Sequence, residues 1–490
     1  MPLRAKILDP SMRQTFKYTY ATTANEVREE PGDEPNDVLF GSQHGVRTIT
    51  LNRPKKLNSL DGSMCRKILP RLQEWSKSQM ANVVVIKGEG RAFCAGGDVG
   101  ALAMQNKQGA EGQNKSKDFF SLEYKLDHFI ATYSKPYVAF LDGITMGGGV
   151  GLSINAPFRI ATENTVFAMP ETTIGFFPDV GASFFLPRLD GQLGMYLALT
   201  SEQLKGVNVF YSGVATHYLH SSSLPDLEAR LSELDFKDND SMEHRLRIIN
   251  STIDEFSTGL PHDQPISSPV GGNIRQAIDY CFQPANTTVK ACLQMVTELA
   301  DRNPDDSGGP EIIDWAKKTK KTILQRSPTS VKVTYKQLRD SPRWSIAETF
   351  IREQGIASRF MEHPDFVEGV SALLIDKPRR TPTWTPASLD EVDRPTVQAF
   401  FPPRDQLGLQ LLKSGEGSDY HEYPYGADIG LPRERTIEAF IDQNRPKDKE
   451  AVVKHFMLQS GGKQGVKEKV EELFNRRITT GTDGSISVRR

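Results

Sequence analysis

The chain has few cysteines, and they are scattered. The 490 residues contain four cysteines, Cys65, Cys94, Cys281 and Cys292, and no two of them form a C-x-x-C pair. Their spacings match neither a zinc ribbon nor a disulfide framework. We therefore expect no metal site, and a reducing compartment such as the cytosol or the mitochondrial matrix.

Long apolar runs and a strong net charge are also missing. The sequence has no apolar run of about 18 residues, so we expect no transmembrane helix and no membrane partner. The formal net charge is −2 at pH 7, which does not favour nucleic acid as the main partner. With 38% hydrophobic and 25% charged residues, the composition is that of a globular protein with a sizeable core.

The net charge of the first 37 residues changes from positive to negative along the chain. Residues 1–25 carry four basic residues against one acid, Asp9. This pattern is typical of a mitochondrial transit segment, and a disordered tail fits it equally well. Residues 26–37 are acidic and contain two prolines, which predicts a solvated linker.

Apolar strands alternate with helical patterns in the first half of the chain. We expect strands at 46–51 (the first ordered segment), 83–86, 137–141, 158–161 and 166–169. Helical patterns occupy 63–77 and the stretch from Leu152 onward. This alternation indicates an α/β fold, whereas residues 220–400 are mainly helical by pattern.

Two glycine turns follow apolar strands, at 95–98 and 146–149. Backbone N–H groups at such turns lack helical partners and can converge on one carbonyl oxygen as an oxyanion hole. A purely structural strand-to-helix turn is the alternative. Neither turn fits a dinucleotide fingerprint or a phosphate loop. Cys94, beside the first turn, is expected to be a buried small residue rather than a nucleophile.

A pair of carboxylates follows these turns. Glu171 comes after Pro170, and Asp179 after Pro178. Apolar surroundings can raise the pKa of one carboxyl while hydrogen bonds keep the other ionised. One could then act as nucleophile or base while the other orients a substrate. Glu171 as an ordinary first-turn helix acid remains the alternative.

The ordered segments 51–60, 93–98, 143–153 and 167–189 together resemble the core of the crotonase superfamily. The strings at 144–153, 167–171 and 177–181 are similar to its 3-hydroxyisobutyryl-CoA hydrolase branch in particular. The resemblance covers about residues 38–400. It implies an α/β fold, a crotonase-like spiral of β-β-α repeats, followed by a mainly helical C-terminal part.

The same resemblance implies roles for individual residues. An acyl-CoA substrate would place its thioester carbonyl on the N–H groups of Gly97 and Gly148. Glu171 is then the catalytic carboxylate, Asp179 holds the 3-hydroxyl, and Glu123 is a further substrate-binding position. No metal and no separate cofactor are expected, because coenzyme A is part of the substrate.

One position departs from the wider superfamily. Enoyl-CoA hydratases carry a second catalytic glutamate after the triple glycine, where this chain has Gly151. A hydratase or isomerase is thereby disfavoured. The expected reaction is hydrolysis of 3-hydroxyisobutyryl-CoA to 3-hydroxyisobutyrate and CoA in valine catabolism, in the mitochondrion. Attack by Glu171 to form an anhydride, or general-base activation of water, both remain open, and an oligomer is compatible with either.

The end of the chain leaves a second hypothesis. Residues 403–490 extend beyond the family pattern, with one charged helix expected at 463–476. We expect residues 1–37 to be a transit segment and linker, 38–402 the hydrolase domain (core 38–220, helical part 221–402), and 403–490 an extension. Relatives of the family occur in fungal mitochondrial ribosomes. A structural protein associated with the mitochondrial small ribosomal subunit is therefore the alternative function.

Overall fold

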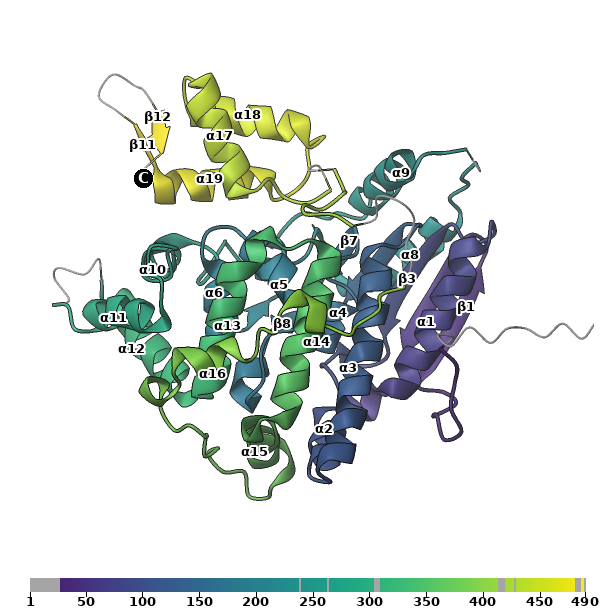
Figure 1. Cartoon of the computed structure of the whole chain (residues 1–490). Helices are drawn as coiled ribbons and strands as arrows, with labels where there is room; N and C mark the ends of the chain where they lie inside the picture. Colours follow the sequence, from purple (N-terminus) through teal and green to yellow (C-terminus); the bar gives the residue numbers. More distant parts are fainter. Residues whose placement is uncertain are drawn as a thin grey trace, which may run out of the picture.

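The computed structural model describes residues 27–237, 239–261, 264–303, 309–412, 419–426, 429–480 and 486–488. The predicted transit segment at 1–25 lies outside the described residues. Figure 1 shows strands enclosed by helices, with the last helices forming a separate layer at one end.

A six-stranded sheet forms one layer of the core. Its strand order is β1 (Val38–Gln43), β2 (Val46–Leu51), β3 (Val83–Gly88), β5 (Tyr137–Leu141), β7 (Phe158–Ala161) and β10 (His217–Tyr218). β1 and β2 form an antiparallel hairpin, and the other pairs are parallel. The central strands are nearly continuous runs of apolar residues, as expected for parallel strands covered on both faces.

A second, four-stranded sheet has the order β4 (Ala92–Cys94), β6 (Ile144–Met146), β8 (Val166–Ala168) and β9 (Leu204–Lys205). β4, β6 and β8 are parallel. The chain therefore places one strand in each sheet per repeat: β3 then β4, β5 then β6, β7 then β8. The carboxyl ends of β4, β6 and β8 consequently meet at one edge.

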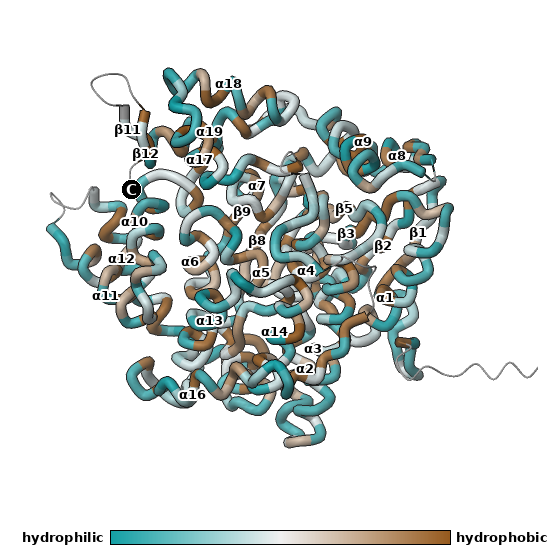
Figure 2. Tube along the Cα trace, turned by 45° about the horizontal axis from the view of Figure 1, so that its top comes forward, coloured by the Kyte–Doolittle hydropathy of each residue, from teal (hydrophilic) through white to brown (hydrophobic). Residues whose placement is uncertain are grey.

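Helices cover both sheets. In the first half they are α1 (Gly62–Lys77), α2 (Val99–Asn106), α3 (Ala110–Ala131), α4 (Gly148–Gly151), α5 (Ala182–Phe185), α6 (Leu193–Thr200) and α7 (Val207–Tyr211). The helical part contains α8 (Leu224–Ser232), α9 (Met242–Asp254), α10 (Gly272–Cys281), α11 (Val289–Ala300), α12 (Pro310–Gln325), α13 (Pro328–Asp340), α14 (Ile346–Glu362), α15 (Pro364–Val370) and α16 (Arg394–Gln398). Figure 2 shows hydrophobic residues alternating with hydrophilic ones along these helices.

Two expectations about the first half are wrong. The first ordered strand is β1, which its mostly exposed side chains concealed. The helix at the triple glycine begins at Gly148 and ends at Gly151 instead of starting at Leu152. The predicted strands at 46–51, 137–141 and 158–161 are confirmed residue for residue.

Most of the acidic segment before β1 is exposed, as expected of a solvated linker, but two of its acids bind α1. The Arg66 guanidinium donates to the Asp33 carboxylate at 2.9 Å. Asp37 is only 1% exposed and pairs with Lys67 at 2.6 Å. The acids thus meet a basic face of α1, because opposite charges that share a partly buried site attract more strongly than in water.

The end of the chain contains three helices where one was expected. They are α17 (Glu434–Asn444), α18 (Lys449–Gln459) and α19 (Val466–Arg477), followed by a hairpin of β11 (Ile478–Thr480) and β12 (Ile486–Val488). These elements bury a hydrophobic cluster of their own: Ile437, Ile441, Val452, Phe456, Val466, Val470, Leu473, Phe474 and Ile478. Figure 1 shows them stacked together beyond the helical layer.

A buried charge network attaches this layer to the core. The Arg476 guanidinium donates to Glu434 at 2.5 Å and pairs with Asp279 of α10 at 3.3 Å. Arg275, also on α10, lies 3.4 Å from Glu434. Glu434, Arg275 and Arg476 are all buried. Each charge therefore depends on its partners for stabilisation, because none of them is well hydrated.

We expect Glu434→Ala to lower the free energy of unfolding of the C-terminal layer by about 3 kcal/mol or more, because it leaves two buried guanidinium groups without this carboxylate. Hydrogen exchange should show faster exchange in α17 and α19. Glu450→Ala, at an exposed position on α18, is the matched control and should behave as wild type. Unchanged exchange in the Glu434 variant would contradict the role assigned to this network.

Candidate active site

The site lies where β4, β6 and β8 end. Gly97 follows the end of β4 by three residues, Gly148 follows the end of β6 by two, and Glu171 follows the end of β8 by three. Since these strands are neighbours and parallel, the segments that follow them are brought to one place. The structure thereby joins three elements that the sequence predicted separately.

The N–H groups of Gly97 and Gly148 are close together. A Cβ atom built on Gly148 would lie 3.3 Å from the nitrogen of Gly97. Neither N–H donates a hydrogen bond within the described part of the chain. Two unoccupied backbone donors on adjoining turns are able to bind one oxyanion. Their predicted role as an oxyanion hole fits this geometry and stays a prediction.

Glu171 begins a short 3-10 helix directly after Pro170 and is 5% exposed. Its Oε1 atom faces Gly147, where a Cβ atom would approach it to 3.0 Å. Gly147 has φ +45°, a conformation that L residues rarely adopt. Oε2 is buried without a hydrogen-bond partner. One oxygen of this carboxyl is therefore available to a substrate.

Burial is the main cause that raises the pKa of Glu171, and the negative charge of Asp179 raises it further. Asp179 is itself buried, and burial raises its pKa as well. The Tyr124 hydroxyl donates to Asp179 Oδ2 at 2.6 Å, which favours the ionised form. The structure thus brings Glu171 and Asp179 into one electrostatically coupled group.

The turn that carries Asp179 is strained, and hydrogen bonds to α14 hold it in place. Val180 has φ +53°, an outlier for a β-branched residue. The N–H groups of Gly181 and Ser183 donate to the Glu353 carboxyl of α14 at 2.7 and 2.8 Å. Burial raises the pKa of Glu353 to about 8. Glu353 thereby fixes the turn that orients Asp179.

α3 adds two more buried carboxyl groups one turn apart, Glu123 and Asp127. Glu123 Oε1 lies 2.5 Å from a Cβ atom built on Gly148, so this predicted substrate-binding residue does reach the oxyanion turn. Burial raises the pKa of both carboxyls. Neither oxygen of Asp127 has a hydrogen-bond partner among the described residues.

Asp127 explains why position 151 is glycine. A Cβ atom on Gly151 would collide with Asp127 Oδ2 and lie 2.8 Å from the Cβ of Val180. Any side chain there would displace a buried carboxyl or a strained turn. A second glutamate at this position is therefore excluded by space as well as by the sequence.

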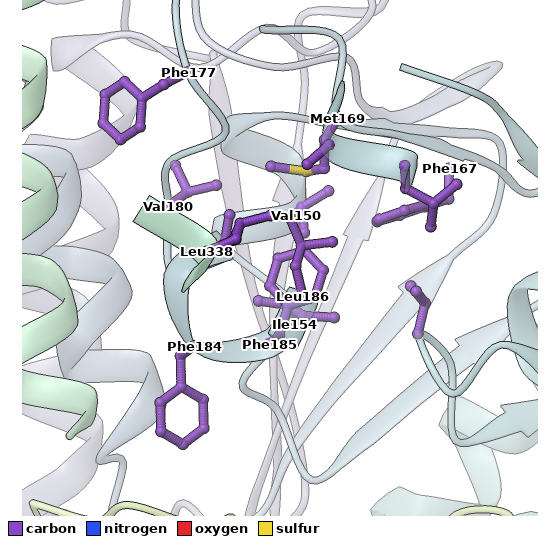
Figure 3. Close-up of a cluster of buried hydrophobic side chains, with 14 of the residues drawn as sticks. Val150, Ile154, Phe167, Met169, Phe177, Val180, Phe184, Phe185, Leu186 and Leu338 are labelled. Carbon is purple, nitrogen blue, oxygen red and sulfur yellow. The ribbon is translucent and has the colours of Figure 1, made fainter. Parts of the chain in front are cut away.

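Apolar side chains form the base of the site. Figure 3 shows Val150, Met169 and Val180 in one cluster with Phe185 and Ile154. Met169 lies two residues before Glu171, and Val180 directly follows Asp179. The two carboxyl-bearing segments are thus anchored by the same packing, and the apolar surroundings account for the raised pKa values.

A cavity of about 800 Å³ borders the Gly97 turn. Leu60, Leu102, Phe119 and Leu122 form much of its wall, and residues 27–30 lie across it. At its rim the Lys56 ammonium pairs with Asp98 at 2.9 Å. The Lys56 side chain is exposed there.

Other candidates are less suited to chemistry. Burial raises the pKa of the Cys94 thiol to about 12, so it is unsuited to act as a thiolate nucleophile at neutral pH. Burial lowers the pKa of His128 to about 4 and also lowers that of His217. Among the described residues, no group of His, Cys, Asp and Glu side chains is arranged to hold a metal ion.

Sequence reasoning missed Tyr124, Asp127 and Glu353. All three are polar residues on helices that look amphipathic, where a polar residue normally faces solvent. The only signal was Tyr124 next to the predicted Glu123. Glu353 is 172 residues from Gly181, so no local pattern could connect them.

Comparisons with known proteins agree with this architecture. The family model for enoyl-CoA hydratase/isomerase matches residues 46–401. The chain is 52% identical over 480 residues to small ribosomal subunit protein mS47 of Neurospora crassa, covering 97% of this chain and 91% of that protein. It is 41% identical over 380 residues to the mitochondrial 3-hydroxyisobutyryl-CoA hydrolase of Gallus gallus, covering 77% and 92%.

A solved structure supports the same fold. The carnitinyl-CoA dehydratase from Mycobacterium thermoresistibile matches with a TM-score of 0.64 and 32% identity, covering 76% of this chain and 98% of that one. The predicted crotonase-like fold is confirmed. Within the described ranges, no helix is both long and apolar enough to cross a membrane.

We expect Asp127→Asn to change how stability depends on pH. Because burial raises the pKa of Asp127 in the folded protein, its native carboxyl keeps a proton that the unfolded chain releases. Wild-type stability is therefore lost as pH rises above the unfolded pKa, by at most about 1.4 kcal/mol per pH unit. The asparagine variant, which cannot ionise, lacks this loss.

Chemical denaturation from pH 5 to pH 8 measures the difference. The stability of Asp127→Asn relative to wild type should increase with pH. Asp142→Asn, whose carboxylate accepts hydrogen bonds at a partly exposed position, serves as control. Parallel stability curves for Asp127→Asn and wild type would show that Asp127 ionises normally.

Proposed function

Because the chain belongs to the enoyl-CoA hydratase/isomerase family, we propose that it hydrolyses the thioester of 3-hydroxyisobutyryl-CoA to 3-hydroxyisobutyrate and CoA. One observation carries this proposal: Glu171 and Asp179 share a buried site beside two free N–H groups, and Gly151 leaves no room for another glutamate. A hydration mechanism that requires a glutamate at position 151 does not fit this site.

The N–H groups of Gly97 and Gly148 would receive the thioester carbonyl. As the carbonyl carbon is attacked, negative charge develops on its oxygen, and preorganised N–H donors stabilise it. The acyl part would point toward Glu171 and Asp179. The remaining lone pairs of Asp179, whose Oδ2 is already held by Tyr124, are suited to accept the 3-hydroxyl proton of the substrate.

Glu171 can act by either of two routes. Its carboxylate attacks the carbonyl carbon, the C–S bond breaks, CoA leaves as thiolate, and water then hydrolyses the anhydride. Alternatively, it removes a proton from water, the resulting hydroxide attacks the same carbon, and the C–S bond breaks to release CoA as thiolate. Both routes need the ionised form of Glu171. Because its pKa is raised, this carboxylate is a stronger base than an ordinary one once its proton is lost.

The hydrolase relatives support the substrate, the place in valine catabolism and the mitochondrial location. The Gallus gallus relative is named mitochondrial 3-hydroxyisobutyryl-CoA hydrolase and is matched over 92% of its length. The cavity next to Gly97, with Lys56 at its rim, is suited to the CoA part of the substrate, whose phosphates are anionic.

We expect Glu171→Gln and Asp179→Asn each to lower kcat/KM for 3-hydroxyisobutyryl-CoA by about a hundredfold or more, since each removes a group that contacts the reacting substrate. CoA release by purified full-length protein is the measurement. Glu362→Gln, a carboxyl-to-amide change at the exposed end of α14, is the control and should retain wild-type turnover. A folded wild type without turnover would overturn the assignment.

A second candidate function rests on the C-terminal layer. The family match ends at residue 401, whereas the alignment with the small ribosomal subunit protein of Neurospora crassa covers 97% of the chain. That alignment must therefore include most of the extension. We propose association with the mitochondrial small ribosomal subunit as an alternative or additional role.

Sedimentation of native protein in a mitochondrial extract tests this role. We expect co-migration with small ribosomal subunits that survives washing at moderate salt and is reduced by Glu434→Ala, because this change loosens the C-terminal layer. Glu171→Gln should co-migrate as wild type does. Free migration of all forms would eliminate the ribosomal role and leave the hydrolase assignment untouched.

A further inference from the structure

A cavity of about 310 Å³ lies between the core and the C-terminal layer. The core contributes Arg159 from β7 and Arg188 from the segment after α5. The C-terminal region contributes Arg433 and Arg435 at the start of α17, and Lys469 of α19. No member of the buried carboxyl cluster lines it, so the cavity is distinct from the candidate active site.

Among the described residues that line this cavity, positive charge exceeds negative charge. The acidic ones among them are Asp190 and Glu422. Asp190 pairs with Lys469 at 2.9 Å. Glu422 is shared, because it lies 3.4 Å from Arg433 and 3.2 Å from Arg435. Five cationic side chains therefore face two carboxylates, and an anion would restore the balance.

Arg159 shows this charge imbalance most clearly. Its side chain is buried and donates to the carbonyl oxygens of Val214 and Ala156, both at 2.6 Å, and more weakly to Gly213 at 3.4 Å. It has no carboxylate partner among the described residues. Carbonyl dipoles orient a guanidinium but do not neutralise it, and an uncompensated buried charge is costly.

Arg188, which also lines the cavity, likewise donates its hydrogen bonds to backbone carbonyl oxygens. It donates to the carbonyl oxygens of Phe184 and His421, both at 2.7 Å, and its guanidinium carbon lies 3.7 Å from the centre of the Phe184 ring. Its Nε is buried without a hydrogen-bond partner. No carboxylate within the described ranges forms an ion pair with it, so both core arginines lack a directly paired carboxylate there.

We propose that this cavity binds a small phosphate-bearing anion. Arginine forks match the oxygens of phosphate, and Arg433 and Arg435 reach the cavity from the exposed side. Tyr423 and Tyr425 line the same space with stacked rings 6.2 Å apart, a surface on which a base or other flat group can pack. The volume is at the small end of ligand sites, so it suits a single nucleotide-sized molecule.

Isothermal titration of the full chain with inorganic phosphate and with AMP tests the site. The double variant R433Q/R435Q removes two partly exposed cations and leaves the buried arginines in place. R71Q/R359Q removes two exposed arginines that also pair with glutamates and that do not line this cavity. The two variants are therefore matched in net charge.

We expect saturable binding of at least one probe by wild type, weakened tenfold or more in R433Q/R435Q and unchanged in R71Q/R359Q. Three results would overturn the proposal. They are no saturable binding of either probe, equal weakening by both variants, or binding of a single-stranded RNA oligonucleotide with neither small probe. The thermal midpoint of each variant without ligand verifies that it is folded.

Discussion

Burial of carboxyl groups is the constraint around which this molecule is organised. Glu123, Asp127, Glu171, Asp179 and Glu353 gather where three parallel strands end, in surroundings that disfavour their ionised forms. Such a concentration of acids opposes folding unless protons or hydrogen bonds compensate. The Tyr124 hydroxyl and the N–H groups of two residues near Asp179 provide that compensation. Among the described residues, Glu171 Oε2 and both oxygens of Asp127 remain without such partners.

The two-sheet spiral explains how one chain brings these groups together. Each repeat leaves a strand in the first sheet and then a strand in the second. A turn at the end of each second-sheet strand faces the same space. Gly97, Gly148 and Glu171 are therefore neighbours although 74 positions of sequence separate the first from the last. Helix α3 closes this space and adds its own carboxyls from the side.

Local signals made part of this predictable. Glycine turns, proline-flanked acids and apolar strands are patterns of a few residues, and they located Gly97, Gly148, Glu171 and Asp179. The structure places all four at one site. The supporting residues were not predictable, because Glu353 acts across 172 positions and resembles any polar helix residue. The C-terminal helices α17 and α18 were missed because their apolar faces are short and pack mainly against the other elements of the same layer.

The attachment of the C-terminal layer implies an order of events during folding. Gln276 meets Arg476 across 200 positions, and His217 meets Lys463 across 246. Contacts this distant cannot form until nearly all of the chain has left the ribosome that makes it. Until then Arg275, buried in the finished molecule, lacks Glu434. The face of the core that carries Arg275 is therefore exposed to water until the C-terminal helices pack against it.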